Sequence, residues 1–236
     1  MERERNSPSA GVPADGPNES QRNQMPAVWK IQRNDAAFPM VSVRQADGAG
    51  SSPVYGVGDQ GILRNRALGL ICSVQCPGSV VIRTFDAIRE LRDAGVVVAG
   101  GFHSPMEREC LDFLLRGEQG VIVCEAKGLD PASLDASWRA AIDAGRLLLL
   151  SLFAADVTRK TEARARARNE FVAVLAAGLL VPYASPGGKA EAAARQVIER
   201  GQPLFTFDDD ENKGLLQLGA RAYNIDDVRK LLAAGA

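Results

Sequence analysis

Short apolar runs that end directly in glycine-rich turns recur along this sequence, and this repetition restricts the fold more than any other feature. The run 96–99 leads into Gly100 and Gly101, and the run 179–183 leads into the turn 185–189. The windows between such runs carry apolar residues at helical spacing. Strand, turn and helix in alternation are typical of a parallel sheet wrapped by helices. The sequence therefore predicts an α/β fold, a Rossmann-like and mainly parallel sheet with helices on both faces.

Turn and capping signals delimit the expected elements. Ser79 is a candidate N-cap for a helix that Gly95 ends. Ser104, Pro105 and Glu107 have the order of a capping box with proline at the first helical position. Core strands are expected at 70–75, 96–99, 121–124, 147–153, 179–183 and 204–207, and further helices at 131–144, 158–177, 189–200 and 226–233. In such a sheet, ligands bind beyond the carboxyl ends of the strands.

The domain organisation follows from a change in composition near residue 50. Residues 1–48 are rich in Pro, Gly, Ser, Asn, Gln and Asp and have few apolar residues in any window, so they are predicted to be a disordered tail. Trp29 and Ile31 are exceptions and are expected to dock locally. Residues 49–236 are predicted to form one Rossmann-like domain.

Charge and cysteine usage limit the classes of function. The net charge is −1 and the pI about 6.0, so nucleic-acid binding would need a local basic patch. No apolar run reaches membrane-spanning length, and the N-terminus lacks a signal-peptide core. The four cysteines are widely spread, and His103 is the only histidine. We therefore expect no metal site, no cofactor, and buried reduced thiols that suit a cytoplasmic protein.

The segment 159–168 is the most basic part of the chain, with five basic side chains and one acidic one. On the predicted helix, Lys160, Arg164 and Arg168 fall at i, i+4 and i+8, and this line continues into the apolar face. Arg168 is therefore expected at the edge of the buried face, near the ligand crevice, whereas Arg166 lies about 200° round the helix and is expected to contribute much less. Contact with a polyanion is one interpretation, because guanidinium groups pair with phosphate. Solvated surface charge is the other.

Three glycine turns are predicted to form a shared anion crevice. Glycines between a strand and a helix let backbone N–H groups approach a phosphate, and the helix N-terminus favours the anion. His103, in the middle turn, is a candidate phosphate donor, or alternatively a residue that packs at the helix entry. The glycine-turn candidates are Gly78, Ser79, Gly100, Gly101, Gly187, Gly188 and Lys189. No catalytic constellation is evident.

Several of these motifs together resemble the DprA/Smf family of DNA-processing proteins. They are the segments 69–79 (GLICSVQCPGS), 99–107 (AGGFHSPME) and 185–188 (SPGG), together with the pair Arg168 and Asn169. The resemblance covers about residues 55–210 and is closest to the short, Rossmann-like members without a winged-helix domain. It implies a domain that binds single-stranded DNA in natural transformation and loads a RecA-type recombinase.

Carried over residue by residue, the resemblance implies a binding crevice made by Gly78 and Ser79, Gly100 and Gly101, Arg168 and Asn169, and Gly187 and Gly188. The family's first turn typically continues with arginine, where this chain has Val80. Single-stranded DNA and a RecA-type recombinase are the implied partners, and a homodimer stays open.

A related superfamily, the LOG-type phosphoribohydrolases, supplies the alternative of a nucleotide sensor or nucleoside-monophosphate hydrolase. Its members share the fold and carry a loop with the pattern PGGxGTxxE. Here the segment 186–194 reads PGGKAEAAA, with Ala194 in the position of the catalytic glutamate. The hydrolase motif is not preserved, so the sequence favours a binding protein over an enzyme.

Overall fold

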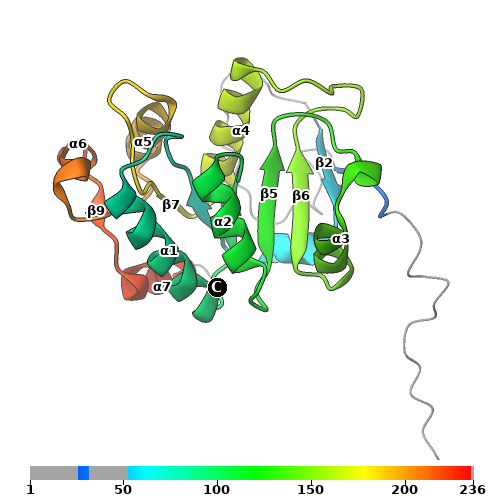
Figure 1. The fold of residues 1–236 in the computed structure, drawn as a ribbon, viewed down its shortest axis with the longest axis horizontal. Helices are drawn as coiled ribbons and strands as arrows, with labels where there is room; N and C mark the ends of the chain where they lie inside the picture. The colour runs from blue at the N-terminus through cyan, green and yellow to red at the C-terminus, as the bar shows by residue number, and fades with distance from the viewer. Residues whose placement is uncertain (1–25, 32–52, 235–236) are drawn as a thin grey trace, which may run out of the picture.

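The described part of the chain, residues 26–31 and 53–234 of a computed structural model, contains one nine-stranded sheet with helices on both faces (Figure 1). The strand order is β1-β2-β6-β5-β4-β3-β7-β8-β9. All pairs from β6 to β9 are parallel, whereas β1 pairs antiparallel with β2, and β2 antiparallel with β6. The predicted α/β fold with a mainly parallel sheet is confirmed.

The elements follow one another in the alternation that the sequence predicts. The strands are β1 (Trp29–Ile31), β2 (Val54–Val57), β3 (Leu68–Leu70), β4 (Val98–Gly100), β5 (Val121–Glu125), β6 (Leu147–Ser151), β7 (Gly178–Leu180), β8 (Leu204–Thr206) and β9 (Arg221–Ala222). The helices are α1 (Gly78–Asp93), α2 (Pro105–Leu114), α3 (Ala136–Asp143), α4 (Glu162–Leu175), α5 (Lys189–Glu199), α6 (Lys213–Gln217) and α7 (Ile225–Ala233).

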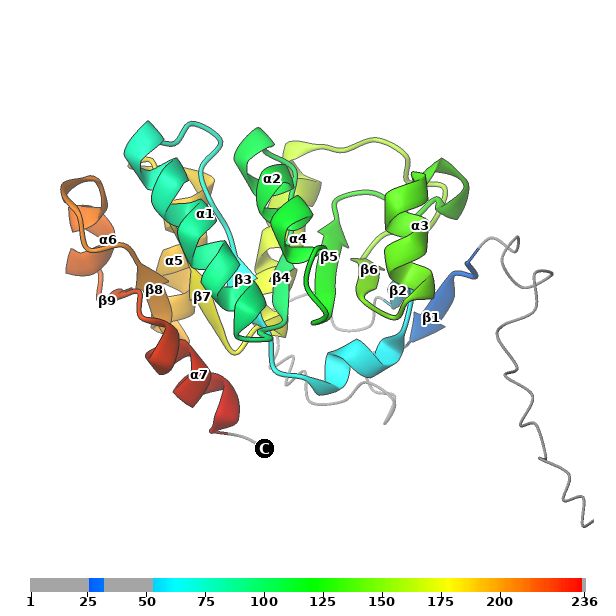
Figure 2. The same ribbon diagram turned by 60° about the horizontal axis from the view of Figure 1, so that its bottom comes forward.

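Two apolar layers hold the helices on the sheet. Helices α1, α2, α3 and α7 cover one face, and α4 and α5 lie behind the sheet on the other (Figure 2). Strand β6 is buried at all five positions, as its nearly unbroken apolar run predicts. Close packing of α4 on β3 depends on Gly69, where a Cβ would run into the side chains of Leu179, Ala176 and Val172. The core thereby fixes α4 directly above the central strands.

Several predicted boundaries are wrong in ways that matter for the site. The first core strand is β3, which ends at Leu70, so 71–77 is a loop rather than a strand. Helix α1 begins at Gly78 with Pro77 as N-cap, and Ser79 lies inside its first turn rather than capping it. Helix α4 begins at Glu162, because the Thr161 side chain accepts a hydrogen bond from the N–H of Arg164 and caps the helix there.

Two local predictions are confirmed. Ser104 and Glu107 form a reciprocal capping box at the start of α2, with Pro105 in the first turn. Trp29 and Ile31 dock as expected: β1 pairs with β2, and the Trp29 indole donates to the carbonyl of Gly58 at 2.9 Å.

Residues 29–31 therefore belong to the sheet rather than to the predicted tail, because Ile31 is buried in the core. The predicted tail segments 1–25 and 32–48 lie outside the described residues. Of the cysteines, Cys72, Cys110 and Cys124 are buried as expected and Cys76 is half-buried. Within the described ranges, no helix combines the length and apolarity needed to cross a bilayer.

Candidate functional site

A cavity of about 660 Å³ opens beyond the carboxyl ends of β3 and β7. The chain leaves β3 through α1 toward β4, and returns later to place β7 on the opposite side of β3. The strand order therefore reverses between these two strands, and such a point leaves a crevice in an open α/β sheet. The loop after β3, one face of α4 and the turn before α5 line the cavity. The cavity thus lies where the sequence predicts the ligand crevice.

One face of the N-terminal half of α4 forms a wall of the cavity. Among its lining residues, Ala165 and Arg166 each lie three or four positions from both Glu162 and Asn169, which places these four on a single side of the helix. Arg166 is exposed, so its guanidinium is free to meet a ligand. The sequence predicts that Arg166 contributes much less than Arg168, yet the lining of the cavity includes both residues.

Arg168 is a buried member of the same wall, only 3% exposed. Its Nε donates to Oδ1 of Asn169 at 2.8 Å, its Nη1 donates to the carbonyl of Cys124 at 3.4 Å, and its Nη2 lies 3.3 Å from Nδ1 of His103. The guanidinium lies on Gly101, where any Cβ would overlap it. Gly101 is thus a glycine because the Arg168 guanidinium occupies the place of a side chain.

Below this guanidinium, Glu107 turns a buried carboxylate toward the middle glycine turn. Its oxygens accept from the backbone N–H groups of Cys72 at 3.4 Å, His103 at 3.2 Å and Ser104 at 3.1 Å. Oε2 also lies 3.1 Å from Nδ1 of His103. Burial alone would raise the pKa of Glu107, but the hydrogen bonds from His103 and Ser104 and the charges of His103 and Arg168 outweigh it and lower this pKa.

The backbone of the middle turn is bent to hold these groups. Phe102 has a φ of 43°. Among the residues that the structure describes, it is the one residue other than glycine with a positive φ. The bend buries the Phe102 ring and leaves the His103 side chain 42% exposed in the cavity wall. The carboxylate of Glu107 therefore fills the anion position that the sequence assigns to a phosphate at this turn.

The turn before α5 is occupied in the same way. The N–H of Gly187 donates to Oε2 of Glu191 at 2.7 Å, and the N–H of Gly188 donates to the carbonyl of Ser185 at 2.9 Å. Glu191 is also bonded by Nε of Arg195 at 2.9 Å. The nearby ammonium of Lys189 pairs with Glu162 at 2.9 Å. An incoming anion must displace these acidic partners.

The structure brings together half of the residues that the sequence singles out. Those that line the cavity are His103, Arg168, Asn169, Gly187, Gly188 and Lys189. Gly101 touches the site through Arg168, whereas the lining does not include Gly78, Ser79, Gly100, Lys160 or Arg164.

The predicted stripe of Lys160, Arg164 and Arg168 is wrong because α4 begins after Lys160. Lys160 instead pairs with Glu125 at 3.0 Å. Arg164 donates to the carbonyl of Arg159 at 2.7 Å and lies over the Phe153 ring. Lys160 therefore lies at the end of β5 and Arg164 lies near the segment after β6, and the cavity lining includes neither.

Replacing Glu191 with glutamine should raise the affinity of the cavity for inorganic pyrophosphate about fivefold, the worth of roughly 1 kcal/mol. The neutral amide leaves the N–H of Gly187 more available and removes one negative charge from the rim. Isothermal titration at low salt measures the effect. Glu199→Gln, an equal charge change at the exposed end of the same helix, is the control. Equal gains in the two variants, or none, would contradict the role given to Glu191.

Comparison with known proteins identifies the fold but no sequence family. No family model matches the sequence, and neither does any curated protein. Among solved structures, DNA processing protein A from Streptococcus pneumoniae superposes with a TM-score of 0.72 at 17% identity, over 89% of this chain and 76% of that one. DNA processing protein A from Helicobacter pylori, described for its single-stranded DNA binding mode, has a TM-score of 0.67 at 21% identity, over 88% and 96% of the two chains.

A molybdenum cofactor binding protein from Rippkaea orientalis is less similar, with a TM-score of 0.50 at 11% identity over 72% of this chain and 97% of that one. The resemblance that the glycine turns suggest thus extends to the architecture of the sheet and its helices. The chain has the fold of DNA processing protein A.

Proposed function

We propose that this protein binds single-stranded DNA in the cavity between β3, α4 and α5. The observation that carries the proposal is the position of the cavity at the reversal of strand order, with Arg166, Lys189 and His103 on its walls. The shared fold with two DNA processing proteins A, one of them described for its single-stranded DNA binding mode, supports it.

The chemistry of the walls suits a single strand with its bases accessible. Arg166 and Lys189 supply mobile cations for phosphates, since both are exposed. Val74, in the loop after β3, is 60% exposed and lines the same cavity, and gives a base an apolar surface. A single strand can present phosphates and unstacked bases to one groove, whereas a duplex keeps its bases paired.

Acidic side chains moderate this binding. Glu162 holds Lys189, and Glu170 also lines the cavity. A phosphate therefore gains Lys189 only after the exposed pair opens, which costs little because such pairs are worth about 0–1 kcal/mol. We expect weak affinity that falls steeply with salt.

Replacing Arg166 with alanine should weaken binding to oligo-dT about tenfold and reduce the slope of log K against log salt by about one, as expected for one lost phosphate contact. A salt series with fluorescently labelled oligo-dT measures both quantities. Arg200→Ala removes an exposed cation at the far end of α5 and serves as the control. If both variants lose the same affinity, binding depends on diffuse charge, and the cavity is not the DNA site.

A small-nucleotide site is the second candidate, because a cavity of about 660 Å³ lies within the range of small-molecule pockets. Hydrolysis is disfavoured, since Ala194, at the position of the hydrolase glutamate, is fully buried in the core. A titration with AMP distinguishes the two candidate ligands. Saturable binding of AMP without binding of oligo-dT would show that the cavity binds a small nucleotide and not DNA.

The remaining parts of the proposal concern the cellular role. We infer a cytoplasmic protein that takes part in transformation or recombination, with a RecA-type recombinase as partner and homodimerisation open. The free thiols of the described cysteines suit a reducing compartment. A pull-down with a RecA-type protein, with and without single-stranded DNA, tests the partner.

A further inference from the structure

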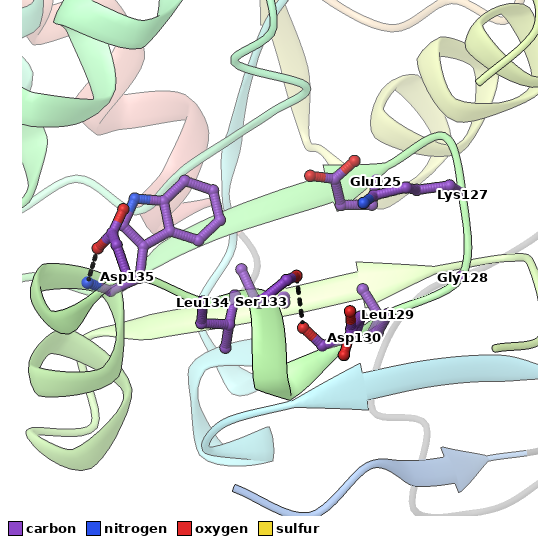
Figure 3. A pocket seen from close by; sticks show the side chains of 10 residues that line it. Glu125, Lys127, Gly128, Leu129, Asp130, Ser133, Leu134 and Asp135 are labelled. Carbon is purple, nitrogen blue, oxygen red and sulfur yellow. Dashed lines mark hydrogen bonds between the residues drawn. The ribbon is translucent and has the colours of Figure 1, made fainter. Parts of the chain in front are cut away.

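A second, smaller pocket of about 180 Å³ lies on the α3 side of the sheet. It is an open pocket between the end of β5, the connection that leads to α3, and α3 itself (Figure 3). Figure 3 shows Glu125 and Lys127 at the strand end on one side, and Asp130, Ser133 and Asp135 on the connection that faces them. This volume is below the range of drug-sized ligands, so the pocket suits a single planar ring system.

The walls combine an aromatic surface with hydrogen-bond acceptors. Trp138 and the aliphatic side chains of Leu129 and Leu149 supply the apolar part, and Trp138 is only half-buried. The carboxylates of Glu125, Asp130 and Asp135 supply the acceptors. An indole face stacks on flat heterocycles, and ionised carboxylates accept from their N–H groups.

Local hydrogen bonds fix two of the three carboxylates in place. Oδ1 of Asp130 accepts from the N–H of Ala132 at 3.1 Å, and Oδ1 of Asp135 accepts from the N–H of Trp138 at 2.8 Å. The hydrogen bonds from the Ser137 hydroxyl and from the N–H of Trp138 lower the pKa of Asp135, so this carboxylate stays ionised at neutral pH. One oxygen of each carboxylate is left for a guest.

The third carboxylate links this pocket to the larger cavity. Oε2 of Glu125 lies 3.0 Å from the ammonium of Lys160, which immediately precedes the cap of α4. Helix α4 begins two residues after Lys160 with Glu162, which lines the larger cavity. Both hollows therefore lie near the carboxyl ends of parallel strands, and Lys160 lies in the chain segment between a residue of the one lining and a residue of the other.

We propose that this pocket receives one nucleobase of the bound strand, and that it prefers guanine to thymine. Guanine has an imino N–H next to an amino group, and a carboxylate can accept hydrogen bonds from both. Carboxylates of DNA-binding proteins accept in the same way from the amino group of cytosine. Thymine flanks its single N–H with two carbonyl oxygens, which the carboxylates repel. Trp138 stacks on the base, and Lys127 and Lys160 meet the flanking phosphates. This assignment rests on the proposed function and adds a base preference to it.

The two lysines separate this assignment from that of a site for a cationic side chain. An arginine would also stack on Trp138 and pair with Glu125. It would, however, have to displace Lys160 from Glu125 and lie beside Lys127, with like charges in contact. A guanine base is neutral and brings no third positive charge beside Lys127 and Lys160, so the two lysines disfavour the arginine and not the base.

Trp138 itself reports on the pocket. The chain has two tryptophans, so Trp29→Phe leaves Trp138 as the only indole fluorophore. We expect dGMP to quench it saturably and to bind about tenfold tighter than dTMP, the discrimination of one good base contact. Both probes carry the same phosphate, so their ratio isolates the base. Saturation by methylguanidinium, or equal affinities for the two nucleotides, would overturn the assignment.

Glu125→Gln, made in the Trp29→Phe background, should bring the dGMP to dTMP ratio close to one. Asp143→Asn, an equal charge change at an exposed position on α3 outside the pocket, should leave the ratio unchanged. Loss of preference in both variants would point to net charge and would overturn the role of Glu125.

Oligonucleotides separate a failure of the pocket from a failure of the proposed function. Oligo-dT and the same oligonucleotide with one central dG are compared by anisotropy. If both bind equally and the mononucleotides show no preference, the pocket assignment is wrong and DNA binding stands. If neither binds while dGMP still exceeds dTMP at Trp138, the base pocket stands and DNA binding is wrong.

Discussion

Replacing Glu107 with alanine is expected to lower the free energy of unfolding by about 3–5 kcal/mol, the cost of breaking a buried charged network. The substitution removes the acceptor for the N–H groups of Cys72, His103 and Ser104, and it leaves the guanidinium of Arg168 without its carboxylate neighbour. Urea denaturation at neutral pH measures the change. Glu107→Gln, which retains one carbonyl acceptor, should cost less.

The same carboxylate predicts how stability depends on pH. Folding lowers the pKa of Glu107 below its ordinary value of 4.5, so its contribution is complete above that value. The contribution is lost as the pH falls below 4.5 and through the lower pKa of the folded state. The stability difference between wild type and Glu107→Gln should therefore shrink in this acidic range. A constant difference from neutral to strongly acidic pH would show that the charge of Glu107 does not stabilise the fold.

Local signals predicted the residues that hold the middle turn. Ser104, Pro105 and Glu107 form a capping box because their spacing alone aligns side chain and backbone. What the local pattern does not contain is the second role of the carboxylate. Glu107 reaches the N–H of Cys72, which lies in the loop after a different strand, and only the parallel pairing of β3 with β4 brings that loop close.

The prediction of a basic stripe on α4 was wrong for a physical reason. A stripe at i, i+4 and i+8 needs all three residues inside one helix, and the Thr161 cap excludes Lys160. Phe171 and Val172 did place Arg168 correctly at the buried face. The sequence does not show, however, that α4 turns its Glu162, Arg166 and Asn169 side toward the reversal of strand order, because that depends on where α5 packs.

The outer strands were missed because their pairing is non-local. Val54–Val57 is a short run with Gly56 inside it, and its partners are β1 and β6. Gly56 is needed there because the Trp29 ring lies over it, where a Cβ would overlap the indole. Neither contact leaves a periodic signal in the segment itself.

Arg166 and Arg168 lie two residues apart, yet the structure gives them different tasks. Arg166 is exposed in the cavity, whereas Arg168 donates to Asn169 and to the carbonyl of Cys124, and its Nη2 lies 3.3 Å from Nδ1 of His103. The former is a candidate phosphate contact. The latter positions His103 and the middle glycine turn, and its direct contact with phosphate stays a prediction from the sequence.

Replacing Arg168 with alanine is therefore expected to lower the free energy of unfolding by about 3 kcal/mol, because it empties a buried site and removes a positive charge that favours the buried carboxylate of Glu107. Arg168→Lys keeps the charge but loses the forked geometry that reaches Asn169, Cys124 and His103 together, so it should still cost about 1–2 kcal/mol. Urea denaturation of both variants measures these costs. Oligo-dT binding should also weaken in both, because the wall of the cavity loses its order.

Arg166→Ala is the matched control for this prediction, since it removes the same side chain from the same helix. It should leave the free energy of unfolding within about 0.5 kcal/mol of the wild type, as surface substitutions generally do, while it lowers DNA affinity and the salt slope. If Arg168→Ala leaves stability unchanged and removes one phosphate contact instead, then the guanidinium is a direct ligand of DNA. The bonds to Asn169 and Cys124 would then hold it in place for the phosphate rather than support the fold.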